Sequence, residues 1–180
     1  MVTVHTPSLF PPERSDERPQ ERELAGLGFH PAVAEWFARR FPEGPTPAQQ
    51  QGWAQIARGR DTLIAAPTGS GKTLAGFLVG IDRLYRAHAR GVAVADTAQV
   101  VYVSPLKALA VDIAENLERP LREIAEGAAE LGFDAPVLRV GVRTGDTTSG
   151  ERAAMVRRPP NFVITTPEPL YLLVTAARSR

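Results

Sequence analysis

A glycine-rich segment, Ala66–Thr73 (APTGSGKT), constrains the fold of this 180-residue chain more than any other stretch. A short apolar run with strand character, residues 61–67, leads into it, and a stretch with helical periodicity, residues 72–90, follows it. Glycine at two positions lets the backbone curl so that successive N–H groups point inward, toward an anion at the helix N-terminus. The segment therefore predicts a phosphate-binding loop between a strand and a helix.

The segment follows the nucleotide-binding pattern G-x-x-x-x-G-K-[ST], with Ala66 in place of the first glycine. In this pattern Lys72 is expected to reach the β- and γ-phosphates, and Thr73 to offer its hydroxyl to Mg²⁺. We take these two residues as catalytic and Thr73 as the metal ligand. The residues expected to hold the nucleotide phosphates are Pro67, Thr68, Gly69, Ser70, Gly71, Lys72 and Thr73.

Apolar runs and helical periods alternate along the rest of the chain. Helices are predicted over residues 30–41, 47–59, 72–90, 106–132 (interrupted or bent at Pro120), 148–158 (capped by Thr148 or Ser149) and 168–178, and strands over 61–67, 98–105, 135–142 and 161–167. Such alternation is typical of an α/β fold with a parallel sheet covered by helices on both faces. Ligands bind at the carboxyl ends of such strands, so we expect the four following loops to converge on one edge.

Residues 1–23 are rich in Pro, Glu and Arg and are predicted to form a disordered leader, with the folded domain over residues 24–180. The chain has no cysteine, which excludes disulfides and thiolate metal sites, and its net charge of +1 indicates no particular partner. It has neither a long apolar run nor a signal-like start, so we expect a cytoplasmic protein without membrane contact. Nineteen of the 21 basic residues are arginine, and the two lysines, Lys72 and Lys107, both lie in motifs.

Five motifs in order, GPTPAQ, AAPTGSGKT, VSPLKALA, RTGDT and ITTPE, resemble the first half of a superfamily 2 (DEAD/DEAH-box-like) helicase motor. The chain resembles most the large helicase-related (Lhr) ATP-dependent DNA helicases, from about Leu24 to Ala177. The resemblance implies part of a RecA-like first lobe, with ATP and Mg²⁺ as cofactors. It implies a 3′-to-5′ DNA helicase acting in DNA repair, with single-stranded DNA or a DNA–RNA hybrid as the partner.

The resemblance also assigns roles to residues. Gln49 would read the adenine, while the aromatic residue that stacks on the base stays open between Phe29, Trp36 and Phe41, because the family's position is Ala32 here. The residues that would lie along the nucleic-acid track are Pro105, Lys107, Arg143, Thr144, Gly145, Thr166, Pro167 and Glu168. Lysine charge, helix N-termini and threonine hydroxyls are suited to contacts with strand phosphates.

The family's second metal-binding motif, Walker B, is an Asp-Glu pair at the end of a strand, and the only Asp-Glu here is Asp16-Glu17. We expect that motif, the second RecA-like lobe and its arginine finger to be missing from this chain, which then binds nucleotide weakly and hydrolyses essentially none. Two alternatives stay open at this point. One is a different P-loop NTPase, such as a small kinase, and the other is a non-hydrolysing nucleotide- or nucleic-acid-binding fragment.

Overall fold

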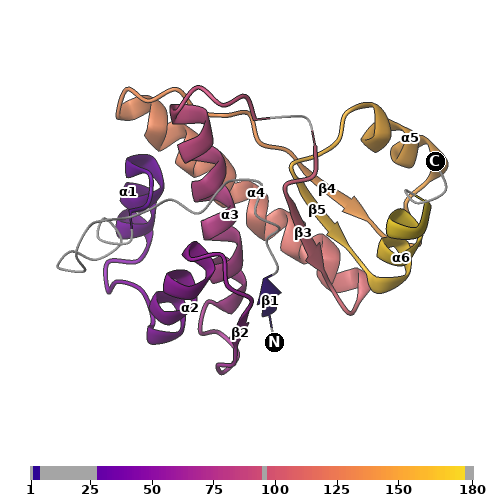
Figure 1. The fold of residues 1–180 in the computed structure, drawn as a ribbon, viewed down its shortest axis with the longest axis horizontal. Coiled ribbons are helices and arrows are strands. Elements are labelled where there is room, and N and C mark those ends of the chain that lie inside the picture. The colour runs from indigo at the N-terminus through magenta and orange to yellow at the C-terminus, as the bar shows by residue number, and fades with distance from the viewer. Residues whose placement is uncertain (1, 5–27, 95–96, 177–180) are drawn as a thin grey trace. The chain divides into compact units, whose positions relative to one another are not determined.

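The computed structural model describes residues 2–4, 28–94 and 97–176 (Figure 1). Helices and strands alternate along most of the chain, as the sequence predicts. In chain order the elements are β1 (Val2–Val4), α1 (Pro31–Arg40), α2 (Pro47–Ala57), β2 (Thr62–Ile64), α3 (Lys72–Ala89), β3 (Val100–Val103), α4 (Lys107–Glu130), β4 (Val140–Arg143), α5 (Ser149–Arg157), β5 (Phe162–Thr165) and α6 (Pro167–Ala176).

The chain forms two compact units, and each is described by itself. Unit 1 comprises Met1–Val92 and Ile124–Ala135, and unit 2 comprises Ala93–Glu123 and Pro136–Arg180. Helix α4 contributes residues to both units. It contains Pro120 yet is one continuous helix, so of the two predictions for this position, an interruption or a bend, the interruption is wrong. Among the described residues, no helix combines the length and the apolar character needed to cross a bilayer.

Unit 1 packs α1, α2 and α3 around a core of large apolar side chains. The most deeply buried of these are Val33, Phe37, Trp53, Ile56, Leu78 and Ile81. Strand β2 pairs antiparallel with β1, in the register Val2↔Ile64. This pairing differs from the prediction that β2 is one of four parallel strands. It also places Val2–Val4, within the expected disordered leader, in a strand, whereas the rest of that leader lies outside the described residues.

Unit 2 is built on a parallel sheet of three strands in the order β3-β5-β4. The central strand β5 is buried along its whole length, because it has a neighbour on each side and carries the apolar run FVIT. Val103, Thr165 and Arg143 share one register position, so the three strands end together. The α/β class with a parallel sheet and helices is therefore confirmed, with three strands in this sheet.

The strand predicted over residues 135–142 is shorter and begins later than expected, at Val140. Pro136 has no N–H to donate to a ladder. The N–H of Arg139 is donated to the side-chain Oδ1 of Asn161, at 3.0 Å, in place of a neighbouring strand. Regular pairing therefore starts only after these residues.

Candidate nucleotide and nucleic-acid sites

The phosphate loop connects β2 to α3 in unit 1. Gly69 and Gly71 have φ angles of +85° and +78°, a left-handed conformation that glycine adopts without steric cost. Pro67, Thr68 and Gly69 are exposed. Helix α3 starts at Lys72, and its N-cap residue Gly71 provides no side-chain cap for the first-turn N–H groups. The backbone thus forms an exposed turn that leads into the positive end of a helix dipole, which suits a phosphate group.

The ammonium of Lys72 lies against the loop itself. Its Nζ donates to the carbonyl oxygens of Ala66 and of Pro67, the latter at 2.7 Å. The hydroxyl oxygen of Ser70 is buried and has no hydrogen-bond partner among the described residues. A nucleotide phosphate would accept from the unpartnered Ser70 hydroxyl and would give Lys72 an anionic partner in place of the carbonyl oxygens. These residues therefore fit a phosphate ligand.

The N-terminus of α2 is hydrogen-bonded to the phosphate loop. Thr46 and Gln49 form a capping box, in which Gln49 Oε1 accepts from the Thr46 N–H at 2.9 Å. The Thr46 hydroxyl donates to the carbonyl oxygen of Ser70 at 3.1 Å, and Gln49 Nε2 donates to that of Gly71 at 3.4 Å. The spacing T-x-x-Q is the sequence signal for this box, and sequence reasoning missed it. Gln49 is only 4% exposed, and its reading of adenine stays a prediction.

Two further hydrogen bonds join α2 to α3 and so fix the base of the loop. The indole N–H of Trp53 donates to the carbonyl oxygen of Ala75 at 2.9 Å. The guanidinium of Arg83 donates to the carbonyl oxygen of Ile56 at 2.7 Å, as a second donor to an acceptor in the last turn of α2 that also binds the Gly59 N–H. Both bonds are formed in or near the core, so α2 carries Thr46 and Gln49 on a firmly packed element.

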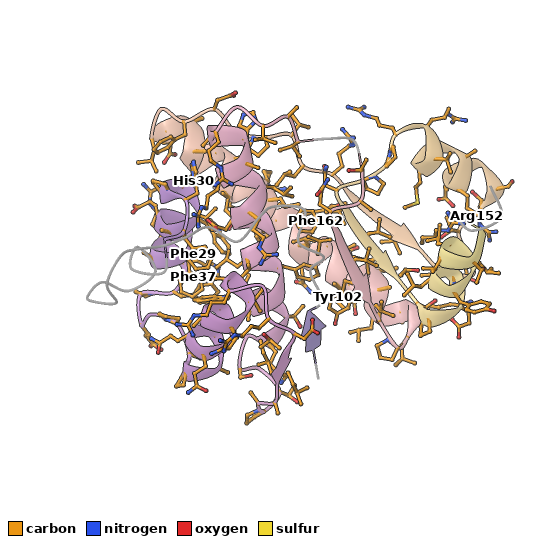
Figure 2. All side chains as sticks on the ribbon, in the orientation of Figure 1. Phe29, His30, Phe37, Tyr102, Arg152 and Phe162 are labelled. Carbon is orange, nitrogen blue, oxygen red and sulfur yellow. The ribbon has the colours of Figure 1, made fainter. Side chains whose placement is uncertain are left out.

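The aromatic residues considered for stacking on the base lie in one aromatic cluster of unit 1. Figure 2 labels two members of this cluster, Phe29 and Phe37. Phe29 packs edge-on against Trp53 with ring centroids 5.3 Å apart, and Trp36 packs edge-on against Phe41 at 6.2 Å. Phe37 joins the two pairs, since it contacts Trp53, Trp36 and Phe41. All three candidates therefore have a packing role, and the choice between them stays open.

The predicted nucleic-acid residues come together at the carboxyl ends of the strands of unit 2. Ser104, Thr144 and Thr166 each follow a strand end directly, and all three are buried. The Ser104 N–H donates to the carbonyl oxygen of Thr165 at 2.7 Å, and the Thr165 hydroxyl donates to that of Arg143 at 2.6 Å. The strand ends are thereby tied to one another. The predicted residues that lie on these strand ends, loops and helix starts are Pro105, Lys107, Arg143, Thr144, Gly145, Thr166, Pro167 and Glu168.

Two further residues contribute to the geometry of the track: Asp146, which the RTGDT motif already placed there, and Arg152, which sequence reasoning did not assign. Asp146 Oδ1 accepts from Lys107 Nζ at 2.7 Å. Arg152 donates from Nε to the carbonyl oxygen of Thr147 at 2.8 Å and from Nη2 to that of Gly145 at 3.4 Å, and so supports the same loop (Figure 2). The Lys107–Asp146 contact joins two elements that meet only in the folded unit, so no spacing rule predicts it. The Arg152 contacts are local and reach back five and seven residues to the turn before its own helix.

Three of the four predicted loops, those after β3, β4 and β5, thus meet at one edge of a sheet. The phosphate loop follows β2, which pairs with β1 in unit 1. The two groups of residues are therefore two candidate sites, one for phosphate in unit 1 and one for a nucleic-acid strand in unit 2.

Comparison with known proteins shows which class of protein carries these sites. The model of the DEAD/DEAH box helicase family matches residues 46–180, three quarters of the chain. The chain therefore belongs to the DEAD/DEAH box helicase family.

Within that family the resemblance to Lhr helicases is confirmed. The Lhr helicase of Mycolicibacterium smegmatis is 50% identical over 152 residues, which are 83% of this chain and 10% of the relative. The Escherichia coli protein described as "Lhr helicase/uracil glycosylase" is 44% identical over 168 residues, 89% of this chain and 10% of the relative. The chain thus spans about a tenth of the length of these two relatives.

A solved structure of Mycobacterium smegmatis helicase Lhr, bound to single-stranded DNA and AMP-PNP, matches the model with a TM-score of 0.74 at 50% identity. The match covers 83% of this chain and 18% of that one. Most of this chain therefore shares its fold with part of a helicase.

Proposed function

We propose that this chain supplies the nucleotide-binding loop and part of the single-strand track of an ATP-dependent DNA helicase that moves 3′ to 5′. One observation carries the proposal. Gly69 and Gly71, both with left-handed backbone conformations, lead into α3, which begins at Lys72, and this chain is similar to a helicase whose structure was solved with AMP-PNP bound. The alternative of a small P-loop kinase explains the phosphate loop but gives no role to the loops after β3, β4 and β5.

In the proposed nucleotide site Lys72 leaves the carbonyl oxygens of Ala66 and Pro67 and binds the β- and γ-phosphates. Backbone N–H groups of residues 68–73 surround the phosphates. Thr73, in the first turn of α3, would hold a Mg²⁺ ion, which when bound neutralises phosphate charge. Gln49 reads adenine and so selects ATP.

In the proposed track Lys107 and Arg143 supply positive charge to the strand phosphates, while the start of α4 and the Glu168 N–H in α6 supply hydrogen-bond donors. Thr144 and Thr166 add hydroxyl groups, and Gly145 lets the strand approach the backbone. The remaining members, Pro105, Pro167 and Glu168, shape the turns into α4 and α6. The partner is single-stranded DNA, with a DNA–RNA hybrid as a second substrate.

We further propose that these 180 residues alone bind ATP but turn it over very slowly, because their only Asp-Glu pair, Asp16-Glu17, follows no apolar strand. A cytoplasmic location and a role in DNA repair complete the proposal. The repair role is supported only by the description of a relative as a helicase and uracil glycosylase. ATP turnover by these 180 residues close to that of a full-length helicase would contradict the proposed slow turnover.

The two lysines of the chain allow a reciprocal test. Binding of a fluorescent ATP analogue with Mg²⁺, and of fluorescein-labelled oligo(dT), is measured for the wild-type chain, Lys72→Ala and Lys107→Ala. We expect Lys72→Ala to lose at least about tenfold in ATP affinity, since a charge-assisted contact is removed, and to keep oligo(dT) binding. Lys107→Ala should keep ATP binding and lower the salt dependence of oligo(dT) binding by about 0.7 in logarithmic slope.

Each lysine variant serves as the charge-matched control for the other, and circular dichroism verifies that both fold. If both variants weakened both ligands equally, the two sites would not be separate, and the proposal would be wrong. Binding of ATP without binding of oligo(dT) by the wild-type chain would favour another P-loop NTPase.

A further inference from the structure

The ion pair between Lys107 and Asp146 joins two of the three loops in the proposed single-strand track. Lys107 is the first residue of α4, after β3, and Asp146 lies in the turn after β4. Their Nζ and Oδ1 atoms are 2.7 Å apart, the distance of a charge-assisted hydrogen bond. The acceptor group that faces the lysine in this structure is therefore a carboxylate oxygen, with the charge and hydrogen-bonding capacity of a phosphate oxygen.

Asp146 is held in place by the turn around it. The Thr144 N–H donates to the Thr147 hydroxyl at 2.9 Å, and the Asp146 N–H donates to the Thr144 hydroxyl at 3.4 Å. Arg152 binds the carbonyl oxygens of Gly145 and Thr147, as described above. The backbone that carries the carboxylate is thus fixed by hydrogen bonds.

The side chain of Lys107 passes directly over this turn. A Cβ atom added at Gly145 would lie 3.4 Å from both Cε and Nζ of Lys107, about van der Waals contact, so the end of the lysine side chain lies close to the backbone of the turn. The ion pair itself is open to solvent, since the Lys107 side chain is 55% exposed and that of Asp146 is 76% exposed. An exposed pair of this kind adds little stability and can be separated at low cost.

We propose that Asp146 occupies the phosphate position on Lys107 when no strand is bound, and that a backbone phosphate of single-stranded nucleic acid displaces it. The inference rests on the proposed function and adds Asp146 as a residue that lowers the affinity for the strand. The carboxylate must leave the lysine before the phosphate binds, and afterwards it repels the bound strand. Asp146 therefore weakens binding of the strand at Lys107. It also disfavours anions whose only contact would be with this lysine.

The test is a double-mutant cycle with the full chain and fluorescein-labelled oligo(dT), measured by anisotropy from about 50 to 500 mM NaCl. Asp146→Asn keeps the size of the side chain and removes its charge. It should tighten binding about two- to fivefold at low salt, the range of an exposed ion pair, and the gain should shrink at high salt. The gain should also be clearly smaller in the Lys107→Ala background, because the pair no longer exists there.

Asp112→Asn is the matched control. Asp112 is an exposed residue on the same helix, five positions after Lys107 and so about 140° around the helix from it. It makes the same charge change without touching the pair, and we expect it to alter oligo(dT) affinity less than Asp146→Asn does. An oligo(U) arm distinguishes a DNA strand from an RNA strand as the source of the phosphate.

A second measurement follows the lysine directly. Because the chain has only two lysines, lysine-selective isotope labelling gives one side-chain NMR signal from Lys107 and one from Lys72. We expect Asp146→Asn to move the Lys107 signal in the free protein, and oligo(dT) to bring the signals of wild type and variant closer together.

Unchanged binding by Asp146→Asn would overturn the inference, because the carboxylate would not compete with the strand. Weaker binding would overturn it too, because the carboxylate would then orient Lys107 for the strand. An equal gain in the Lys107→Ala background, or in Asp112→Asn, would overturn it as well, because the effect would be one of net charge. These outcomes leave the proposed function intact. Failure of the wild-type chain to bind either oligonucleotide would overturn the proposed track and the inference together.

Discussion

Gln49 and Gly71 are in direct contact: the side-chain Nε2 of Gln49 donates to the carbonyl oxygen of Gly71 at 3.4 Å. A Cβ atom on residue 71 would overlap with the same Nε2 atom. Gly71 therefore meets two requirements at once, a left-handed backbone and an empty space beside the glutamine. The start of α2 and the start of α3 are matched at this point, so the phosphate loop depends on a residue more than 20 positions upstream.

Gly71→Ala should destabilise the chain more than Gly69→Ala does. Both substitutions place a Cβ in a left-handed conformation, at a cost of about 1–2 kcal/mol, but only residue 71 has a neighbour within 4 Å. The difference between their free energies of unfolding, measured in urea, isolates the overlap with Gln49. Equal losses would show that the glutamine moves away freely.

Gln49→Ala should weaken ATP more than GTP, by about tenfold or more in relative affinity, if the carboxamide pairs with adenine as we propose. Loss of the capping box and of the bond to Gly71 affects both nucleotides alike. Titration with fluorescent analogues of the two nucleotides separates these effects. Thr46→Ala is the control, because it removes the cap and the contact to Ser70 but leaves the glutamine in place. An equal loss of ATP and GTP would limit Gln49 to supporting the loop.

The stability of unit 1 should fall as the pH drops below about 6.5, the ordinary value for histidine. Burial lowers the pKa of the His30 imidazole, and the charges of Arg86 and His88 lower it further. The unfolded chain then binds a proton more readily than the folded chain, so acid favours unfolding.

His30→Asn should reduce that pH dependence between pH 7 and pH 5, measured as the urea midpoint of unfolding. Asparagine can still cap α1, where His30 Nδ1 now accepts from the Ala32 N–H at 3.2 Å, and it does not titrate. The same pH dependence in the variant would assign the effect to other groups.

Thr148→Ala should raise the pKa of Glu151 and fray the start of α5. Hydrogen bonds from the backbone N–H and then the hydroxyl of Thr148 hold the pKa of the Glu151 carboxyl below its ordinary value. Its contribution to folding is therefore present above pH 4.5 and is lost as the pH falls through the lowered pKa. NMR titration of the Glu151 carboxyl measures the shift. Ser149→Ala, one position along, is the control and should leave the titration unchanged.

Local features were predictable because short stretches of sequence determine them. The starts of α2, α3 and α5 follow from Thr46, Gly71 and Thr148, which act on residues within one turn of the helix. The T-x-x-Q spacing predicts the capping box at α2, although sequence reasoning missed it. The phosphate loop was predicted for the same reason, since its glycines and Lys72 are contiguous. The start of β4 was placed five residues too early, more than that of any other strand, where Pro136 and the Asn161 side chain act against strand pairing.

The sequence by itself determined the family, the order of the elements and the residues of the two candidate sites, because these depend on patterns of neighbouring residues. The tertiary structure alone decided that β2 pairs with β1, that β5 lies between β3 and β4, and that Lys107 meets Asp146 across 39 positions. Strand pairing and exposed ion pairs join segments far apart in the chain. Their energies depend on which surfaces folding brings together, and no local pattern records that choice.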